Sequence, residues 1–125
     1  MRTICCSLMT LALALALAPA PGHAQSSCSG EAHRHFDFWE GRWMVRAANG
    51  ALAGHNTLSL GLGECVLQEH YTTPSGYEGR SLNVFDQTRG VWHQTWVDNG
   101  GLLLQLEGGY RDGRMVMQGE TIDTA

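Results

Sequence analysis

The sequence contains no lysine, and all eight of its basic residues are arginines. One of these, Arg2, precedes the domain, so residues 25–125 carry seven arginines against twelve acidic residues. Nucleic acids and anionic membrane surfaces are recognised by basic patches, which a mildly acidic chain does not supply. The composition therefore argues against both as partners.

The sequence also lacks an apolar run long enough to span a bilayer. Residues 4–18 are apolar and uncharged. This run of about fifteen residues is shorter than the roughly twenty that a spanning helix needs. Arg2 precedes the run and the small residues of positions 22–24 follow it, which is typical of a secretory signal peptide. We expect a signal peptide over residues 1–24, and a periplasmic or secreted mature chain over residues 25–125 that is no longer bound to the membrane.

Cysteine is scarce in the mature chain. Of the four cysteines, Cys5 and Cys6 leave with the signal peptide, which leaves Cys28 and Cys65. An even number of cysteines in an oxidising compartment predicts a disulfide between them, the alternative being two unrelated thiols. Closing a loop of that length would stabilise the fold by roughly 3 to 4 kcal/mol.

No segment has the composition of a linker between domains, and no repeat is evident, so we expect one domain. Beyond residue 40, short strand-forming segments alternate with turn-forming residues. The expected strands are Arg42–Ala47, His55–Leu60, Cys65–Thr72, Gly79–Phe85, Val91–Val97, Leu102–Glu107 and Met115–Glu120. The separating residues are Asn49-Gly50, Gly61 to Gly63, Pro74 to Gly76, Asp86 to Gly90, Asp98 to Gly101 and Asp112-Gly113. This spacing predicts an all-β antiparallel meander of about seven strands.

The stretch HRHFDFWEGRWMV, residues 33–45, precedes the first strand. A short helix that starts near residues 29–31 and runs to Trp39 would place Phe36 and Trp39 on one face, and Gly41 would end it. We expect Phe36, Phe38 and Trp39 to plug one end of a barrel, with Trp43 starting the sheet and packing beneath it.

The histidines of this stretch raise the question of a metal site. His33 and His35 are two residues apart, and a helix would turn them about 200° away from each other. We therefore interpret them as a polar tail before the helix, and we predict no metal site with His55, His70 or His93 either.

Alternation along the strands indicates what lies inside the barrel. In Val91–Asp98, Trp92, Gln94 and Trp96 share one face and His93 points to the other. Neighbouring strands group Leu67, Glu69 and Tyr71 on one face, and Ser81, Asn83 and Phe85 on another. Such mixed aromatic and polar faces favour a cavity for a small molecule over a solid core, although the aromatic residues could equally fill the barrel. The candidate ligand-binding residues are Trp43, Glu69, Tyr71, Asn83, Phe85, Gln94 and Trp96.

Glu69 is the strongest candidate for chemistry. If Leu67, Glu69 and Tyr71 face inward, Glu69 becomes a buried acid with a raised pKa, suited to orienting a ligand or acting as a general base. The alternative is a hydrogen-bonded structural carboxylate. An enzyme of this kind would be an isomerase, cyclase or hydrolase that uses Glu69, Asn83 or His93.

Known catalytic signatures are missing from the chain. It has no nucleophile elbow, no phosphate-binding glycine loop and no Cys-His arrangement, and we predict no cofactor. The glycines at 61, 63, 108 and 109 are interpreted as turns and bulges.

The block Phe36-Asp37-Phe38-Trp39 followed by Gly41-x-Trp43 resembles a family of exported bacterial proteins of unknown function that open with FDFWxGxW. The likeness continues through Gly54 to Asn56, Gly63 to His70, Ser81 to Asp86, Trp92 to Asp98 and Leu106 to Gly113. The resemblance implies a lipocalin-like or nitrobindin-like β-barrel and a small hydrophobic or amphipathic ligand.

Barrels of that family use eight to ten strands, whereas we count about seven. We therefore expect an incomplete barrel, truncated at its C-terminus, without any haem-binding residue of a late strand. Its open sheet edges would favour a homodimer. A truncated product without independent activity is the remaining alternative.

Overall fold

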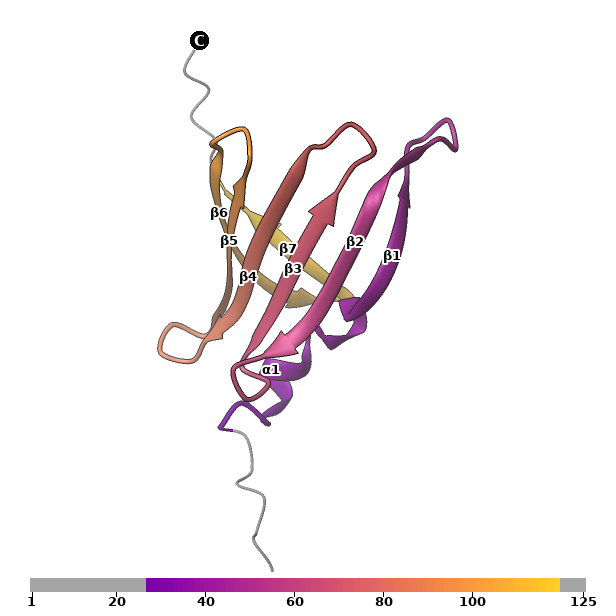
Figure 1. Ribbon diagram of the computed structural model, residues 1–125. Coiled ribbons are helices and arrows are strands. Elements are labelled where there is room, and N and C mark those ends of the chain that lie inside the picture. Colours follow the sequence, from indigo (N-terminus) through magenta and orange to yellow (C-terminus); the bar gives the residue numbers. More distant parts are fainter. Residues whose placement is uncertain (1–26, 120–125) are drawn as a thin grey trace, which may run out of the picture.

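The computed structural model describes residues 27–119 as one antiparallel sheet of seven strands, curled into a half-barrel with a short helix at one end (Figure 1). The elements are α1 (Glu31–Arg34), the 3-10 helix η1 (Asp37–Trp39), β1 (Gly41–Arg46), β2 (Leu52–Gly61), β3 (Val66–Thr72), β4 (Glu78–Asp86), β5 (Val91–Asp98), β6 (Leu103–Arg111) and β7 (Arg114–Gln118). Each strand pairs with its neighbour in the sequence. The predicted all-β meander of about seven strands is confirmed, whereas the predicted signal peptide lies outside the described residues.

The hairpin between β6 and β7 shows why turn residues separate the strands. Arg111 pairs with Arg114, and the two residues between them, Asp112 and Gly113, have φ values of 50° and 77°. Two successive positive φ values make a type I′ turn, whose twist matches that of the strands it joins. The Asp-Gly pair therefore produces the tight hairpin expected from the sequence.

Strand β6 is longer than predicted and runs through Gly108 and Gly109 to Arg111. The prediction of a turn or bulge at these two glycines is wrong, as it is for Gly61, the last residue of β2. A Cβ at Gly108 would lie 1.8 Å from the carbonyl oxygen of Val116, so glycine allows the backbone of the paired strand β7 to approach closely at this point.

The helical segment plugs one end of the half-barrel. Phe36 stacks on Trp39 with ring centroids 5.1 Å apart and meets Trp92 edge to face at 5.3 Å. Phe36 and Trp92 form the buried core with Leu58 and Leu67. The predicted helical plug is confirmed, although it is divided into α1 and η1.

Phe38, expected in the plug, and Trp43, expected to pack beneath the barrel, are both more exposed than predicted. Phe38, in the 3-10 turn, lies 5.8 Å from Phe36 between ring centroids but remains 59% exposed. Trp43 is 45% exposed on edge strand β1 and donates its indole N–H to the carbonyl oxygen of Trp39 at 2.8 Å. Gly41 between them has a φ of 134°, which allows the turn from η1 into β1 that we predicted.

The two histidines before the FDFW block are not a polar tail. His33 lies in α1, is 8% exposed and meets Phe85 edge to face at 5.1 Å, while His35 stacks on Tyr110 at 4.9 Å. They contact different strands because the helix turns them apart. Residues 27–119 contain no group of three or more metal-ligating side chains.

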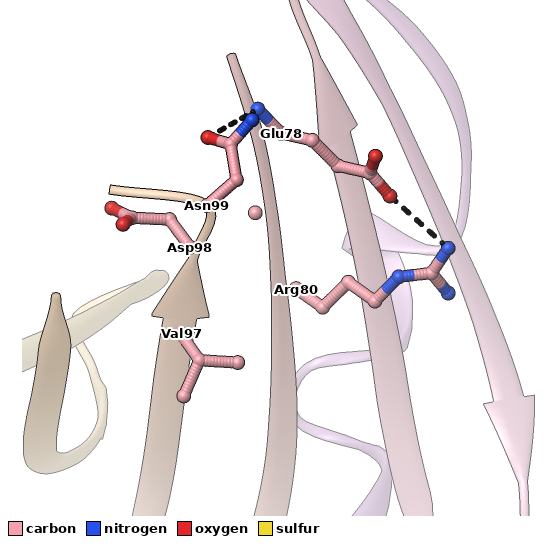
Figure 2. Close-up of a pocket in the computed structure, with 6 residues that line it drawn as sticks. Glu78, Arg80, Val97, Asp98 and Asn99 are labelled. Atoms are coloured by element: carbon pink, nitrogen blue, oxygen red, sulfur yellow. Dashed lines mark hydrogen bonds and ion pairs between the residues drawn. The ribbon is translucent and has the colours of Figure 1, made fainter. Parts of the chain in front are cut away.

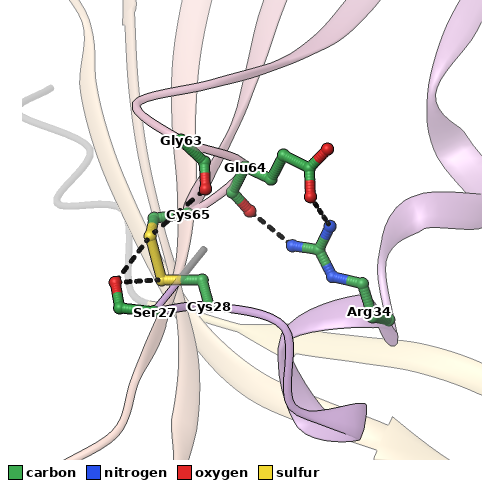
Figure 3. Close-up of a disulfide and its surroundings, with 6 residues drawn as sticks. All are labelled: Ser27, Cys28, Arg34, Gly63, Glu64 and Cys65. Carbon is green, nitrogen blue, oxygen red and sulfur yellow. Dashed lines mark hydrogen bonds and ion pairs between the residues drawn. A yellow bond between two sulfur atoms is a disulfide. The ribbon is translucent and has the colours of Figure 1, made fainter. Parts of the chain in front are cut away.

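The disulfide ties the N-terminal segment to the start of β3. Cys28 and Cys65 are bonded, with their Cα atoms 5.0 Å apart, which confirms the predicted pair (Figure 3). Beside it, Arg34 donates a hydrogen bond to the carbonyl oxygen of Glu64 and lies 3.7 Å from the Glu64 carboxylate. Covalent and ionic links therefore hold the plug at one end of the sheet.

The outermost strands are β1 and β7. Within residues 27–119 each of them pairs on one side, and they do not pair with each other. None of the helices in the described part of the chain has the length and apolarity to cross a membrane.

Candidate functional site

All seven candidate ligand-binding residues lie on the inner face of the sheet, the face that packs on the plug. Residues paired directly across antiparallel strands point to the same side. The pairs Trp43 with Asn56, Asn56 with Tyr71, Glu69 with Ser81, Ser81 with Trp96, Asn83 with Gln94 and Phe85 with Trp92 therefore place them together. The inner face has three levels, which are a plugged end beside the helix, a polar layer in the middle and an open end beyond it.

The polar layer is centred on the Glu69 carboxylate, which is 8% exposed. Asn56 donates its side-chain amide to Oε1 at 2.6 Å, and Ser81 donates its hydroxyl to Oε2 at 2.6 Å. Gln94 adds a longer bond of 3.3 Å to Oε2. Three donors from β2, β4 and β5 therefore converge on one carboxylate of β3.

Asn83 belongs to the same layer, on the side of Glu69 that is nearer to the plugged end, and is fully buried. Its amide nitrogen donates to the carbonyl oxygen of Leu67 at 3.1 Å and to the Ser81 hydroxyl at 3.0 Å. Its Oδ1 atom is buried without a partner, as is Oδ1 of Asn56. Two buried acceptors in the layer are therefore unsatisfied.

The open end carries two aromatic rings, each of which covers a glycine on the neighbouring strand. A Cβ at Gly54 would lie 2.6 Å from the Tyr71 ring, and one at Gly79 would lie 2.0 Å from the Trp96 ring. Both aromatic residues are half-buried. The glycines therefore let the rings lie flat against the sheet, with part of each ring exposed.

Asp98 connects two aromatic side chains at the edge of the open end. Its Oδ2 accepts the Tyr77 hydroxyl at 2.8 Å and lies 3.5 Å from the indole nitrogen of Trp96. The Tyr77 hydrogen bond lowers the pKa of Asp98, with further support from the backbone N–H groups of Leu102 and Gly100. The same bond raises the pKa of Tyr77.

Phe85 and His93 do not join the open end. Phe85 packs at the plugged end against His33 and lies 6.0 Å from Trp92, centroid to centroid. His93 lies on the outer face, where Nδ1 is 3.1 Å from Glu107 Oε1 and Nε2 is 2.9 Å from the Thr95 hydroxyl. His93, one of the alternative catalytic residues of the enzyme hypothesis, therefore does not face the interior of the half-barrel, because adjacent strand residues point to opposite faces.

A surface hollow lies at the ends of β4 and β5 on the outer side (Figure 2). Asn99 accepts the backbone N–H of Glu78 at 3.2 Å, and Arg80 lies 3.3 Å from the Glu78 carboxylate. The hydrogen bond from His70, followed by that from Arg80, lowers the pKa of Glu78. These exposed ion pairs involve none of the candidate residues.

Asn56 and Ser81 complete the site, and neither is among the candidate ligand-binding residues that the sequence predicts. Alternation along His55–Leu60 places Asn56 on the same side as Leu58 and Leu60, so a polar residue among apolar ones was a usable signal. Ser81 shares the face of Asn83 and Phe85 by the same rule. What the sequence does not show is that both converge on Glu69.

The fold is thus that of a curled antiparallel half-barrel whose inner face is plugged at one end. Comparison of the sequence with known protein families, curated proteins and solved structures finds no match.

Proposed function

We propose that the inner face binds a small hydrophobic or amphipathic molecule at its open end. The observation that carries the proposal is the placement of partly exposed aromatic rings, Tyr71, Trp96 and the edge residue Trp43, beside a buried polar layer. Ligand sites combine mainly apolar walls with a few fixed polar groups, and this arrangement supplies both.

The plug supports this assignment because it closes one end of the inner face and leaves the other uncovered. Phe36 and Trp39 cover the apolar residues near Trp92, and no described segment covers Trp96 in the same way. Partly exposed aromatic surface is stabilised when an apolar molecule displaces water from it.

An enzyme that uses Glu69 as an acid or base is the second candidate, in the isomerase, cyclase or hydrolase classes. The three hydrogen bonds fix the orientation of the Glu69 carboxylate, which favours the role of a structural or ligand-orienting group. Turnover of a captured ligand that disappears in Glu69→Gln, with the fold retained, would favour the enzyme instead.

We also propose that the protein is exported to the periplasm or secreted, and that it is related to the exported lipocalin-like family with the FDFWxGxW block. The disulfide is compatible with an oxidising compartment. Oxidation of Cys28 and Cys65 in protein recovered from the periplasm or medium is the expected result, and fully reduced protein confined to the cytosol would contradict it.

A homodimer through the edges of β1 and β7 is a further proposal. Both edges present backbone groups that a second copy of the chain could pair with, and Trp43 and Met44 on β1 are exposed. Sedimentation velocity over a hundredfold concentration range tests it, with a concentration-dependent dimer expected and a constant monomer contradicting it.

Native mass spectrometry of protein purified from its host tests the binding function. We expect an adduct of a small apolar or amphipathic molecule that is lost or weakened in Trp96→Ala. Val97→Ala is the matched control, because Val97 is the next residue of β5, points to the outer face and is 48% exposed. Adducts of equal abundance in both variants, or no adduct together with no binding of added apolar ligands, would contradict the proposal.

A further inference from the structure

We infer that the polar end of the ligand is a positively charged hydrogen-bond donor, such as a primary ammonium group on an apolar body, and that the Glu69 layer receives it. This inference rests on the proposed binding function and specifies the chemical class of the ligand. It is carried by the balance of donors, acceptors and charge in the polar layer.

The layer has more acceptors than donors. Ser81 uses its single hydroxyl proton on Glu69, and the amide of Asn83 uses both protons on Leu67 and Ser81. The Oδ1 atoms of Asn56 and Asn83 remain unpaired, although both residues are more than nine-tenths buried. Buried acceptors without a partner are costly, so a group that brings donors is favoured over one that brings acceptors.

The charge of the layer is also uncompensated. No arginine or histidine among residues 27–119 forms an ion pair with Glu69, whereas the arginines of the ion pairs lie with Asp37, Glu64, Glu78, Asp86 and Glu107. His70, the next residue along β3, points to the outer face and bonds Glu78. A buried carboxylate without a cation is stabilised by a cationic ligand and destabilised by an anionic one.

Gln94 lies between Glu69 and the solvent, so a ligand would reach Glu69 past the Gln94 side chain. It is half-buried, whereas Asn56, Glu69, Ser81 and Asn83 are buried, so it is the member of the layer nearest to solvent. Its bonds to Glu69 and Ser81 measure 3.3 and 3.1 Å, longer than the 2.6 Å bonds beneath it. An ammonium group makes shorter and stronger bonds to a carboxylate than a neutral amide does, and can therefore replace Gln94.

The aromatic rings at the open end fit the same class of ligand. Trp96 lies directly across from Ser81 in the register, and Tyr71 is two residues from Glu69 on β3. Indole and phenol faces attract cations and also cover an apolar chain, so an alkylammonium ligand matches both levels of the face.

Titration of the wild-type protein with octylammonium, 1-octanol and octanoate at pH 7 tests the inference, with tryptophan fluorescence and calorimetry as readouts. The three probes share one apolar chain and differ in the head group. We expect octylammonium to bind at least about tenfold more tightly than octanol, and octanoate to bind most weakly. Equal affinities, as would result if ordered water satisfies the free acceptors, or tightest binding of octanoate would overturn the inference and leave the binding function standing. No binding of any probe would overturn both.

The variant Glu69→Gln tests whether the Glu69 carboxylate recognises the positive charge of the ligand's head group. It retains the shape of the side chain, and we expect its affinity for octylammonium to fall about tenfold, to the level of octanol. Glu78→Gln is the matched control, since it makes the same change of net charge on the outer face of β4, and we expect it to keep the preference for octylammonium. A preference that survives in folded Glu69→Gln would overturn the assignment. Should that variant not fold, the head-group series on the wild-type protein decides the question.

Discussion

Trp92 and Trp96 lie four residues apart on β5 and on the same face of the sheet, yet their surroundings differ. Trp92 is 3% exposed, contacts Phe36 and donates its indole N–H to the carbonyl oxygen of Ala32 at 3.2 Å. Trp96 is half-buried and lies over Gly79 with its nitrogen near Asp98. The difference is produced by the helix, which covers one end of the inner face and leaves the other accessible.

One strand pattern can therefore serve two purposes. Alternation places both tryptophans on the inner face, and the plug then buries Trp92 and leaves Trp96 partly exposed. The Glu69 layer lies between them, so a molecule at the open end meets polar groups before it meets the core.

Replacing Trp92 or Trp96 by alanine should give the largest difference in the free energy of unfolding. Trp92→Ala is expected to cost about 3 to 5 kcal/mol of the free energy of unfolding, because it leaves a cavity between the plug and the sheet. Trp96→Ala should cost no more than about half of that, since its ring is partly hydrated in the folded state. Urea unfolding of the two variants measures the difference, and equal losses would show that the open end is as much a core as the plugged end.

Loss of the disulfide should weaken the plugged end next most strongly. The bond between Cys28 and Cys65 spans 37 residues. Its removal in the double serine variant should lower the free energy of unfolding by about 3 to 4 kcal/mol, because the unfolded chain regains the conformational entropy that the bond restricts. Thermal unfolding with and without reductant measures the loss, and the serine variant should not respond to reductant. A wild-type melting temperature that is insensitive to full reduction would contradict the role assigned to the bond.

Much of the inner face was predictable from the sequence because the period of a strand is two. Asn83, Gln94 and Trp96 fall on the predicted side, and the Cys28 to Cys65 pair follows from an even cysteine count. The same rule places His93 on the opposite face, where the structure has it beside Glu107 and Thr95.

Other features depend on tertiary contacts that no local pattern encodes. Phe38 lies in the 3-10 turn and is exposed, and Gly108 is a strand residue because it pairs with both Trp92 and Met117. The convergence of Asn56 and Ser81 on Glu69 requires the register of three strands, which alternation within one strand does not determine.

Replacing a glycine beneath an aromatic ring should have a smaller effect on stability. Gly79→Ala should displace the Trp96 ring and cost about 1 to 3 kcal/mol, because the added Cβ would lie 2.0 Å from it. Gly109→Ala is the control within β6, where nothing lies within 4 Å of the added atom. Chemical denaturation followed by tryptophan fluorescence tests the pair, and an unchanged emission spectrum in Gly79→Ala would show that the ring is not held against the glycine.

The smallest expected effects come from two acids with opposite pKa shifts. The Tyr77 hydrogen bond lowers the pKa of Asp98 below 3.8, whereas burial, partly offset by Arg34, raises the pKa of Asp37 above 3.8. Asp98 therefore contributes stability that is full above pH 3.8 and is lost as the pH falls through its folded pKa. For Asp37 the contribution is present below pH 3.8 and is lost as the pH rises through its folded pKa.

Unfolding of Asp98→Asn and Asp37→Asn at pH 7 and pH 3 measures these signs. Asp98→Asn should be less stable than the wild-type protein at pH 7, with the difference shrinking at pH 3. Asp37→Asn should be neutral or slightly stabilising at pH 7. The reverse order at pH 7 would contradict the opposite pKa shifts of the two carboxyl groups.

The proposed binding function requires that the ligand bind at the open end and not at the plugged end. The four tryptophans, Trp39, Trp43, Trp92 and Trp96, provide indole N–H signals on both sides of the polar layer. In a ¹H-¹⁵N spectrum recorded during titration with octylammonium, we predict a shift of the Trp96 indole signal and of the Gln94 side-chain amide, with the Trp92 indole unchanged. A spectrum in which the Trp92 signal moves and that of Trp96 does not would contradict the account.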